Sequence, residues 1–184
     1  VARMVYAFKA AGAAAERMVS LEEVAGVAQK ALDNIRTMGV ALSPCIVPQV
    51  GEPTFQIEDD EIEIGMGIHG EKGIEVRKMM TADEVAETLV GRITEDMPLA
   101  EGDEVSVLVN GLGATPMEEQ LIVYRRVHEL LNDMGVKVVM PHVGEYATSM
   151  EMAGLSVTIF KLDEQLKELL LSPAKTPFYT NLNK

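Results

Sequence analysis

The chain has 184 residues, of which 47% are hydrophobic and 24% are charged, and its formal net charge is −13. A chain of this length can bury roughly 70% of its unfolded surface in one domain, so it needs neither disulfides nor a metal to fold. The acidic balance disfavours nucleic acid and anionic membranes as partners, because no basic stripe is present to neutralise phosphates. No apolar run approaches the ~20 residues that a membrane-spanning helix needs.

The single cysteine, Cys45, leaves no disulfide framework and fits a reducing compartment such as the cytoplasm. Its neighbours in the sequence supply no base that would make it a thiolate, so we expect a small buried hydrophobic side chain. The chain begins inside a helical pattern, without an initiator methionine and without the early positive region of a signal peptide. We therefore expect it to be part of something longer.

The N-terminal third is predicted to be helical and then extended. Residues 1–18 are apolar or alanine on nearly every helical face, so such a helix should be covered on all sides. Ser20 and Glu23 form a capping box that starts a second helix, which we expect to run to Gly39. Residues 40–50 should be extended chain broken by prolines. Residues 55–66 should form a half-exposed strand with its acidic side chains in solvent.

The cleanest unit of the sequence lies in its second half. Buried strands are expected at residues 104–110 and 136–141, with a helix at residues 117–135 between them. Such a βαβ unit implies a parallel pair of strands. Pro116 is predicted at the first helical position after Thr115, with Glu118 completing a capping box.

Further elements surround this unit. Thr81 and Glu84 form another capping box, which starts a helix that runs through Ile93. A strand at residues 155–161 and a short helix from Asp163 follow the βαβ unit. The expected fold class is therefore α/β, with a mixed sheet, one βαβ unit and flanking helices.

Two parts of the sequence are weak candidates for a functional site. The loop of residues 110–115 joins a strand end to a helix N-terminus, where an anion is favoured. It matches neither common phosphate-binding motif, so a tight structural turn is the more frequent meaning of such a loop. His128 and His142 have no histidine partner at helical spacing and no clustered cysteines, and we expect no metal site in this chain.

His69 differs from the other two histidines because glycines surround it in the string GMGIHGEKG, residues 65–73. Small residues let the backbone bend and let a ligand approach closely. A histidine in such a place could act as an acid or base, as a metal ligand or as a nucleophile. A surface hairpin with an incidental histidine explains the spacing equally well.

Four motifs together resemble the dihydroxyacetone kinase K subunit, in its C-terminal half. They are AGAAAE, GMGIHGEKGI, LVNGLGATPMEE and GEYATSMEMAGLSVTIFKLD, in this order along the chain. The resemblance extends over essentially all 184 residues, to the TPFYTN string near the C-terminus.

The resemblance implies a kinase that converts dihydroxyacetone to dihydroxyacetone phosphate. In this family the histidine that corresponds to His69 binds the substrate covalently, as a hemiaminal. Gly67 and Gly70 would then border the small substrate. A covalent bond makes sense physically, because a three-carbon polyol has too few atoms to be held firmly by other contacts.

The resemblance also implies what residues 1–184 should lack. The family's active site lies between two domains, and the first domain supplies a glycine-rich loop and the acid/base residues. We therefore expect residues 1–184 to be the C-terminal domain alone and to be inactive as an isolated fragment. The phosphoryl donor, ADP/ATP, is expected on a separate partner L subunit that depends on the phosphotransferase system, with no cofactor in this chain.

Two further expectations follow from the family. Some of its paralogues are coactivators that bind dihydroxyacetone and switch on a transcription regulator, and they should also keep His69. The family is dimeric, and an apolar first helix with twelve methionines in the chain leaves adaptable surface for a homodimer. Residues upstream of Val1 would distinguish a kinase from a coactivator.

Overall fold

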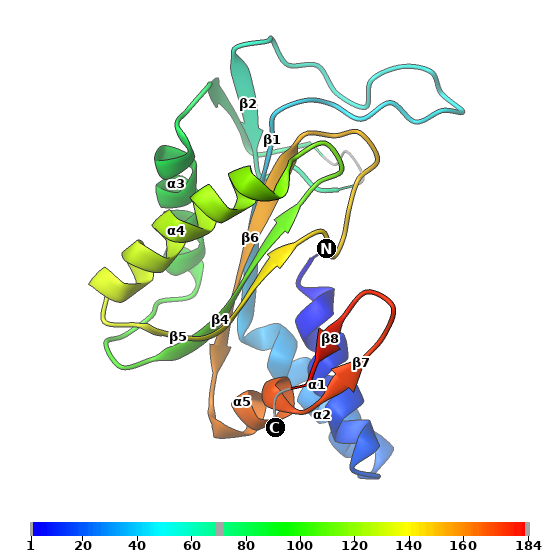
Figure 1. Ribbon diagram of the computed structural model, residues 1–184, viewed down its shortest axis with the longest axis vertical. Coiled ribbons are helices and arrows are strands. Elements are labelled where there is room, and N and C mark those ends of the chain that lie inside the picture. Colours follow the sequence, from blue (N-terminus) through cyan, green and yellow to red (C-terminus); the bar gives the residue numbers. More distant parts are fainter. Residues whose placement is uncertain (1, 69–71, 183–184) are drawn as a thin grey trace.

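The centre of the molecule is a six-stranded mixed sheet (Figure 1). The structure, a computed structural model, describes residues 2–68 and 72–182. The strand order is β3-β2-β1-β6-β4-β5. The pair β4 and β5 is parallel, and the other neighbours are antiparallel. The strands are β1 (Ile35–Ala41), β2 (Glu61–Ile64), β3 (Glu75–Lys78), β4 (Glu104–Gly111), β5 (Lys137–Gly144) and β6 (Gly154–Leu162).

Helices cover both faces of this sheet (Figure 1). On one face, α3 (Ala82–Asp96) and α4 (Met117–Asp133) pack on a core that holds most of the valines of β4 and β6. On the other face lie α1 (Met4–Glu16), α2 (Leu21–Asp33) and α5 (Glu164–Leu171). Their core includes Leu108 and Phe160. The predicted α/β class with a mixed sheet and flanking helices is confirmed.

Several elements predicted from local sequence patterns are confirmed by the structure. The Ser20–Glu23 and Thr81–Glu84 capping boxes both form, with reciprocal bonds between side chain and backbone. The predicted βαβ unit is β4–α4–β5, and Asp163 caps α5 by accepting a bond from the Leu166 N–H. Cys45 is free and buried, as expected.

The predicted end of the second helix was wrong. α2 stops at Asp33, and Ile35 already starts β1, which pairs with β6 over seven consecutive residues. The helical spacing of Ile35 and Met38 does not prevail, because a strand at the centre of a sheet gains hydrogen bonds and packing on both of its sides. Gly39 lies within β1 rather than after a helix.

Two further boundaries differ from the prediction. The strand expected at residues 55–66 is limited to β2, and Glu63 on it is only 4% exposed rather than solvated. Pro116 is the N-cap of α4 and not its first residue, without a side-chain cap. The Thr115 hydroxyl instead accepts a bond from the Gly154 N–H at 2.7 Å, and the predicted capping box does not form.

The first helix is covered on one side only within the described residues. Tyr6 is buried, whereas Phe8 is 70% exposed. A small hairpin of β7 (Ala174–Lys175) and β8 (Thr180–Asn181) follows α5. Among residues 2–68 and 72–182, no helix is long and apolar enough to cross a membrane.

Candidate ligand-binding site

The glycine-rich segment connects β2 to β3, and glycines hold both of its ends. Gly65 has a positive φ of 84° and donates its N–H to the Gly39 carbonyl at 2.7 Å. A Cβ at Gly65 would lie 2.9 Å from the Ile74 side chain. At the other end a Cβ at Gly73 would lie 2.5 Å from the Ile64 carbonyl oxygen. A side chain at either position would collide with the opposite strand, so these two glycines are needed for β2 and β3 to pair at this end of the hairpin.

Glu63 fixes the same closure with its side chain. The Glu63 carboxylate accepts a hydrogen bond from the Gly73 N–H at 2.6 Å. This contact explains why one carboxylate of the acidic stretch is buried while Asp60 stays in solvent and pairs with Lys78. The sequence gives no local sign of it, because the two residues meet only when the strands pair.

A cavity of about 260 Å³ lies beside the first half of this segment. Gly65, Met66, Gly67 and Ile68 form one wall. The rest of the lining comes from the start of α1, from β1 and from β6: Ala2, Arg3, Arg36, Thr37, Met38, Gly39 and Ser156. Of the predicted site residues, Gly67 lines this cavity. His69 and Gly70 lie outside the described residues.

Gly39 and Ser156, which line the cavity, belong to a row of paired residues that face the same side of the sheet. Ser156 on β6 pairs with Gly39 on β1 and with Asn110 on β4. A Cβ at Gly39 would lie 2.9 Å from the Met66 carbonyl oxygen, so glycine lets the segment approach the sheet closely. Ser156 is 7% exposed, and its hydroxyl has no hydrogen-bond partner.

Asn110, at the end of the row, organises the neighbouring loop. Its amide donates to the Ala147 carbonyl at 2.8 Å and accepts from the N–H groups of Tyr146 and Ala147 at 2.9 and 2.8 Å. The side chain is completely buried. Asn110 thereby fixes the β5–β6 loop over the end of β4.

The turn between β4 and α4 is structural, as the sequence suggested. The Ala114 N–H donates to the Met152 carbonyl and the Thr115 N–H to the Leu112 carbonyl, so these donors are not free for an anion. A Cβ at Gly113 would lie 1.4 Å from the Met150 carbonyl oxygen. Glycine is therefore required there by the β5–β6 loop and not by a ligand.

The other two histidines belong to the scaffold. His128 is exposed on α4, beside the Tyr124 ring. His142 is buried on β5, with its ring nitrogens 3.3 Å from the Tyr6 hydroxyl and 3.1 Å from the Tyr179 hydroxyl. Burial, with a smaller contribution from Lys9, lowers the pKa of the His142 imidazole to about 4. His142 is therefore a neutral member of a buried polar cluster rather than part of the candidate site.

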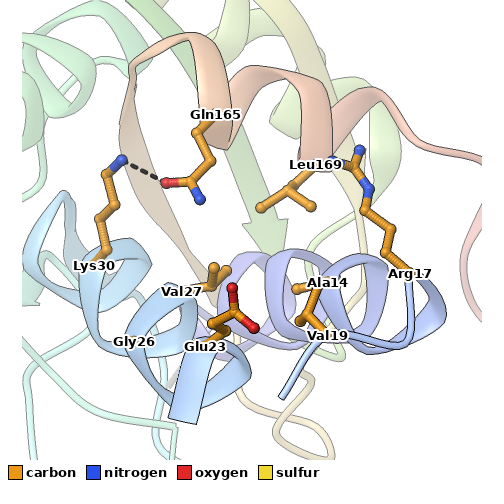
Figure 2. Close-up of a pocket in the computed structure, with 9 residues that line it drawn as sticks. All are labelled: Ala14, Arg17, Val19, Glu23, Gly26, Val27, Lys30, Gln165 and Leu169. Atoms are coloured by element: carbon orange, nitrogen blue, oxygen red, sulfur yellow. Dashed lines mark hydrogen bonds between the residues drawn. The ribbon is translucent and has the colours of Figure 1, made fainter. Parts of the chain in front are cut away.

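A second cavity, of about 240 Å³, lies between α1, α2 and α5 (Figure 2). Two cationic side chains line it, and both have partners. Lys30 donates to the Gln165 amide oxygen at 2.7 Å and pairs with Asp163, and Arg17 lies 3.1 Å from the Glu168 carboxylate. In the part of the chain that the structure describes, no three side chains of histidine, cysteine, aspartate or glutamate gather as a metal site would need.

The chain is similar to known proteins over most of its length. The chain matches the Dak1 domain over residues 1–178. It is 50% identical over 177 residues to the dihydroxyacetone-binding subunit DhaK of PTS-dependent dihydroxyacetone kinase 1 from Listeria innocua, covering 96% of this chain and 54% of that subunit. It is 44% identical over 176 residues to L-erythrulose kinase from Pectobacterium atrosepticum, covering 94% of this chain and 30% of that enzyme.

A solved structure is similar as well. The dihydroxyacetone kinase operon co-activator Dha-DhaQ superposes with a TM-score of 0.87 at 32% identity, over 94% of this chain and 54% of that protein. The chain belongs to the Dak1 domain family. It spans about half the length of the DhaK subunit that it matches.

Proposed function

We propose that this chain is the substrate-binding half of a dihydroxyacetone kinase K subunit and that it holds dihydroxyacetone covalently on His69. The observation that carries the proposal is the cavity beside Gly65–Gly67 and Ile68, because the next residue along the chain is His69. The 50% identity to a subunit named for binding dihydroxyacetone supports the same substrate. Residues 1–184 would act as one of two domains of the full-length subunit.

The covalent step needs only the imidazole and the ketone. An unprotonated ring nitrogen of His69 attacks the carbonyl carbon, so a C–N bond forms while the π pair of the C=O bond moves to oxygen. The oxygen takes up a proton and the ring releases one, which gives a neutral hemiaminal. The ring must be neutral to attack, so binding should weaken as the pH falls below the pKa of the imidazole, ordinarily about 6.5. A hydroxyl of the bound ketone then accepts the phosphoryl group.

The other partners complete the proposal. The phosphoryl donor would be ADP/ATP on a partner L subunit of the phosphotransferase-system-dependent type, in keeping with the "PTS-dependent" name of the Listeria relative. We propose a homodimer in the cytoplasm, because Met4 and Phe8 leave an exposed apolar stripe on α1 and the single cysteine is free. Sedimentation of the full-length protein would measure its oligomeric state.

Replacement of His69 tests the proposed function. The His69→Ala variant of the full-length protein, assayed with its L subunit and dihydroxyacetone, should lose at least about a hundredfold in kcat/KM, because a group that acts on the reacting atoms is removed. His128→Ala is the matched control, since His128 is an exposed histidine on α4, and it should keep full activity. Normal turnover by His69→Ala would refute the covalent proposal.

A second candidate function is a coactivator that binds dihydroxyacetone without phosphorylating it. The TM-score of 0.87 to the dihydroxyacetone kinase operon co-activator Dha-DhaQ favours it. Turnover separates the two functions: a kinase forms dihydroxyacetone phosphate with the L subunit, whereas a coactivator binds dihydroxyacetone and forms none. Acceptance of L-erythrulose in the same assay would extend the substrate to a four-carbon ketose, as the name of the Pectobacterium relative suggests.

A further inference from the structure

Ser156 carries a hydroxyl that the fold does not use. Its side chain is 7% exposed, and its Oγ is buried without a hydrogen-bond partner. Two residues later on the same face of β6, the Thr158 hydroxyl is bonded to the Thr37 hydroxyl at 2.8 Å. A buried hydroxyl without a partner destabilises a protein, and alanine would avoid that cost at position 156. The unpartnered hydroxyl therefore points to a ligand.

The surroundings of Ser156 indicate which ligand. Ser156 and Met66 both line the 260 Å³ cavity, and the Met66 carbonyl lies over Gly39, next to Ser156 in the sheet. A serine hydroxyl can both donate and accept, which suits a hydroxyl group of a ligand. The cavity lies just below the range of about 300–1,000 Å³ that is typical for larger ligands, so it suits a short polyol.

We propose that the Ser156 hydroxyl binds the hydroxyl of the ketose that is not phosphorylated. The inference rests on the proposed function and adds the residue that recognises the second hydroxyl of the substrate. The substrate class is then a short ketose with a hydroxyl group on each side of its carbonyl. A ketone without the second hydroxyl gains nothing from Ser156.

Comparison of two substrates tests the inference. Hydroxyacetone keeps one hydroxyl for phosphorylation and lacks the other. In the full-length protein with its L subunit, Ser156→Ala should lower kcat/KM for dihydroxyacetone about tenfold, as expected for one lost hydrogen bond, and leave kcat/KM for hydroxyacetone unchanged. An equal loss with both substrates, or no loss with either, would overturn the inference. If the protein binds dihydroxyacetone without phosphorylating it, the dissociation constants of the two ketones, measured by calorimetry, replace kcat/KM in this comparison.

Thr158→Val is the matched control. Valine has nearly the same shape as threonine, so this substitution removes only a buried hydroxyl from the face of β6 that also carries Ser156. Unlike the Ser156 hydroxyl, the Thr158 hydroxyl has a protein partner. Thr158→Val should lower the melting temperature and keep the preference for dihydroxyacetone, whereas Ser156→Ala should not lower the melting temperature. An equal loss of preference in Thr158→Val would contradict a specific role for Ser156. Normal activity of His69→Ala would refute the covalent mechanism without bearing on Ser156.

Discussion

Single polar side chains in the interior determine how the end of the sheet is built. Asn110, Glu63 and Thr115 each bond to backbone groups of another segment: the β5–β6 loop, Gly73 and Gly154. Such bonds are made by buried side chains, so their loss leaves backbone groups without partners. These residues position the loops around the cavity without lining it.

Asn110 should be the most sensitive of these positions. Asn110→Ala removes one donated and two accepted hydrogen bonds from a fully buried site. We expect the free energy of unfolding to fall by about 2–4 kcal/mol in urea denaturation, because three backbone groups lose their partner. Gln29→Ala also removes a side-chain hydrogen bond, to Asp33, but on the exposed surface of α2, and it should change stability by less than about 0.5 kcal/mol. Equal effects of the two substitutions would contradict this account.

His142 should make the stability depend on pH. Its folded-state pKa of about 4 lies below the ordinary value of 6.5, so the unfolded chain binds a proton more readily between these values. The free energy of unfolding should therefore be unaffected by His142 above about pH 6.5. As the pH falls from there to about 4, protonation of His142 in the unfolded chain should lower it by up to about 3 kcal/mol. Tyr6, Tyr146 and Tyr179 in the same cluster stay neutral in this range, because burial raises their pKa values, and Lys9, with a pKa of about 8, stays charged.

Unfolding free energies measured from pH 7 to pH 4 check this prediction. His142→Gln keeps a donor and an acceptor but cannot titrate, so its stability should decrease less over this range. The carboxylates of the protein contribute equally to both curves and cancel in the difference. Parallel curves for the two proteins would show that His142 does not carry the effect.

At the scale of elements, the glycines of helices and of loops have opposite roles. Gly91 lies inside α3, where a Cβ would meet no atom within 4 Å apart from its own stretch of helix, whereas Gly113 lies where a Cβ would overlap the Met150 carbonyl. The helical glycine only weakens its helix, because it leaves the unfolded chain more freedom. The loop glycine is required for two segments to meet.

A pair of alanine substitutions distinguishes these roles. Gly91→Ala should raise the free energy of unfolding by about 0.5–1 kcal/mol, and Gly113→Ala should lower it by more than that amount. Thermal melting of both variants gives the two signs directly. A destabilised Gly91→Ala variant would mean that α3 has a neighbour at that position outside the described contacts.

For the whole molecule, the features that could be predicted from the sequence are those determined by residues close together in the chain. The two capping boxes and the βαβ unit are formed by residues near each other in the chain, and they were predicted correctly. The end of α2 was missed because the partner of β1 is β6, about 120 residues further along. The role of Glu63 and the unpartnered hydroxyl of Ser156 were missed for the same reason. Both depend on which strands become neighbours and not on any motif.

The place of β6 in the sheet has a consequence for biosynthesis. This strand lies between β1 and β4, and it is the last of the six strands in the chain. Until residues 154–162 have emerged from the ribosome, β1 and β4 lack the neighbour that joins them, and each presents an unpaired edge. Contacts between segments so distant in sequence form slowly, and unpaired edges invite aggregation. The nascent chain should therefore be most prone to edge-to-edge association before this single strand is made.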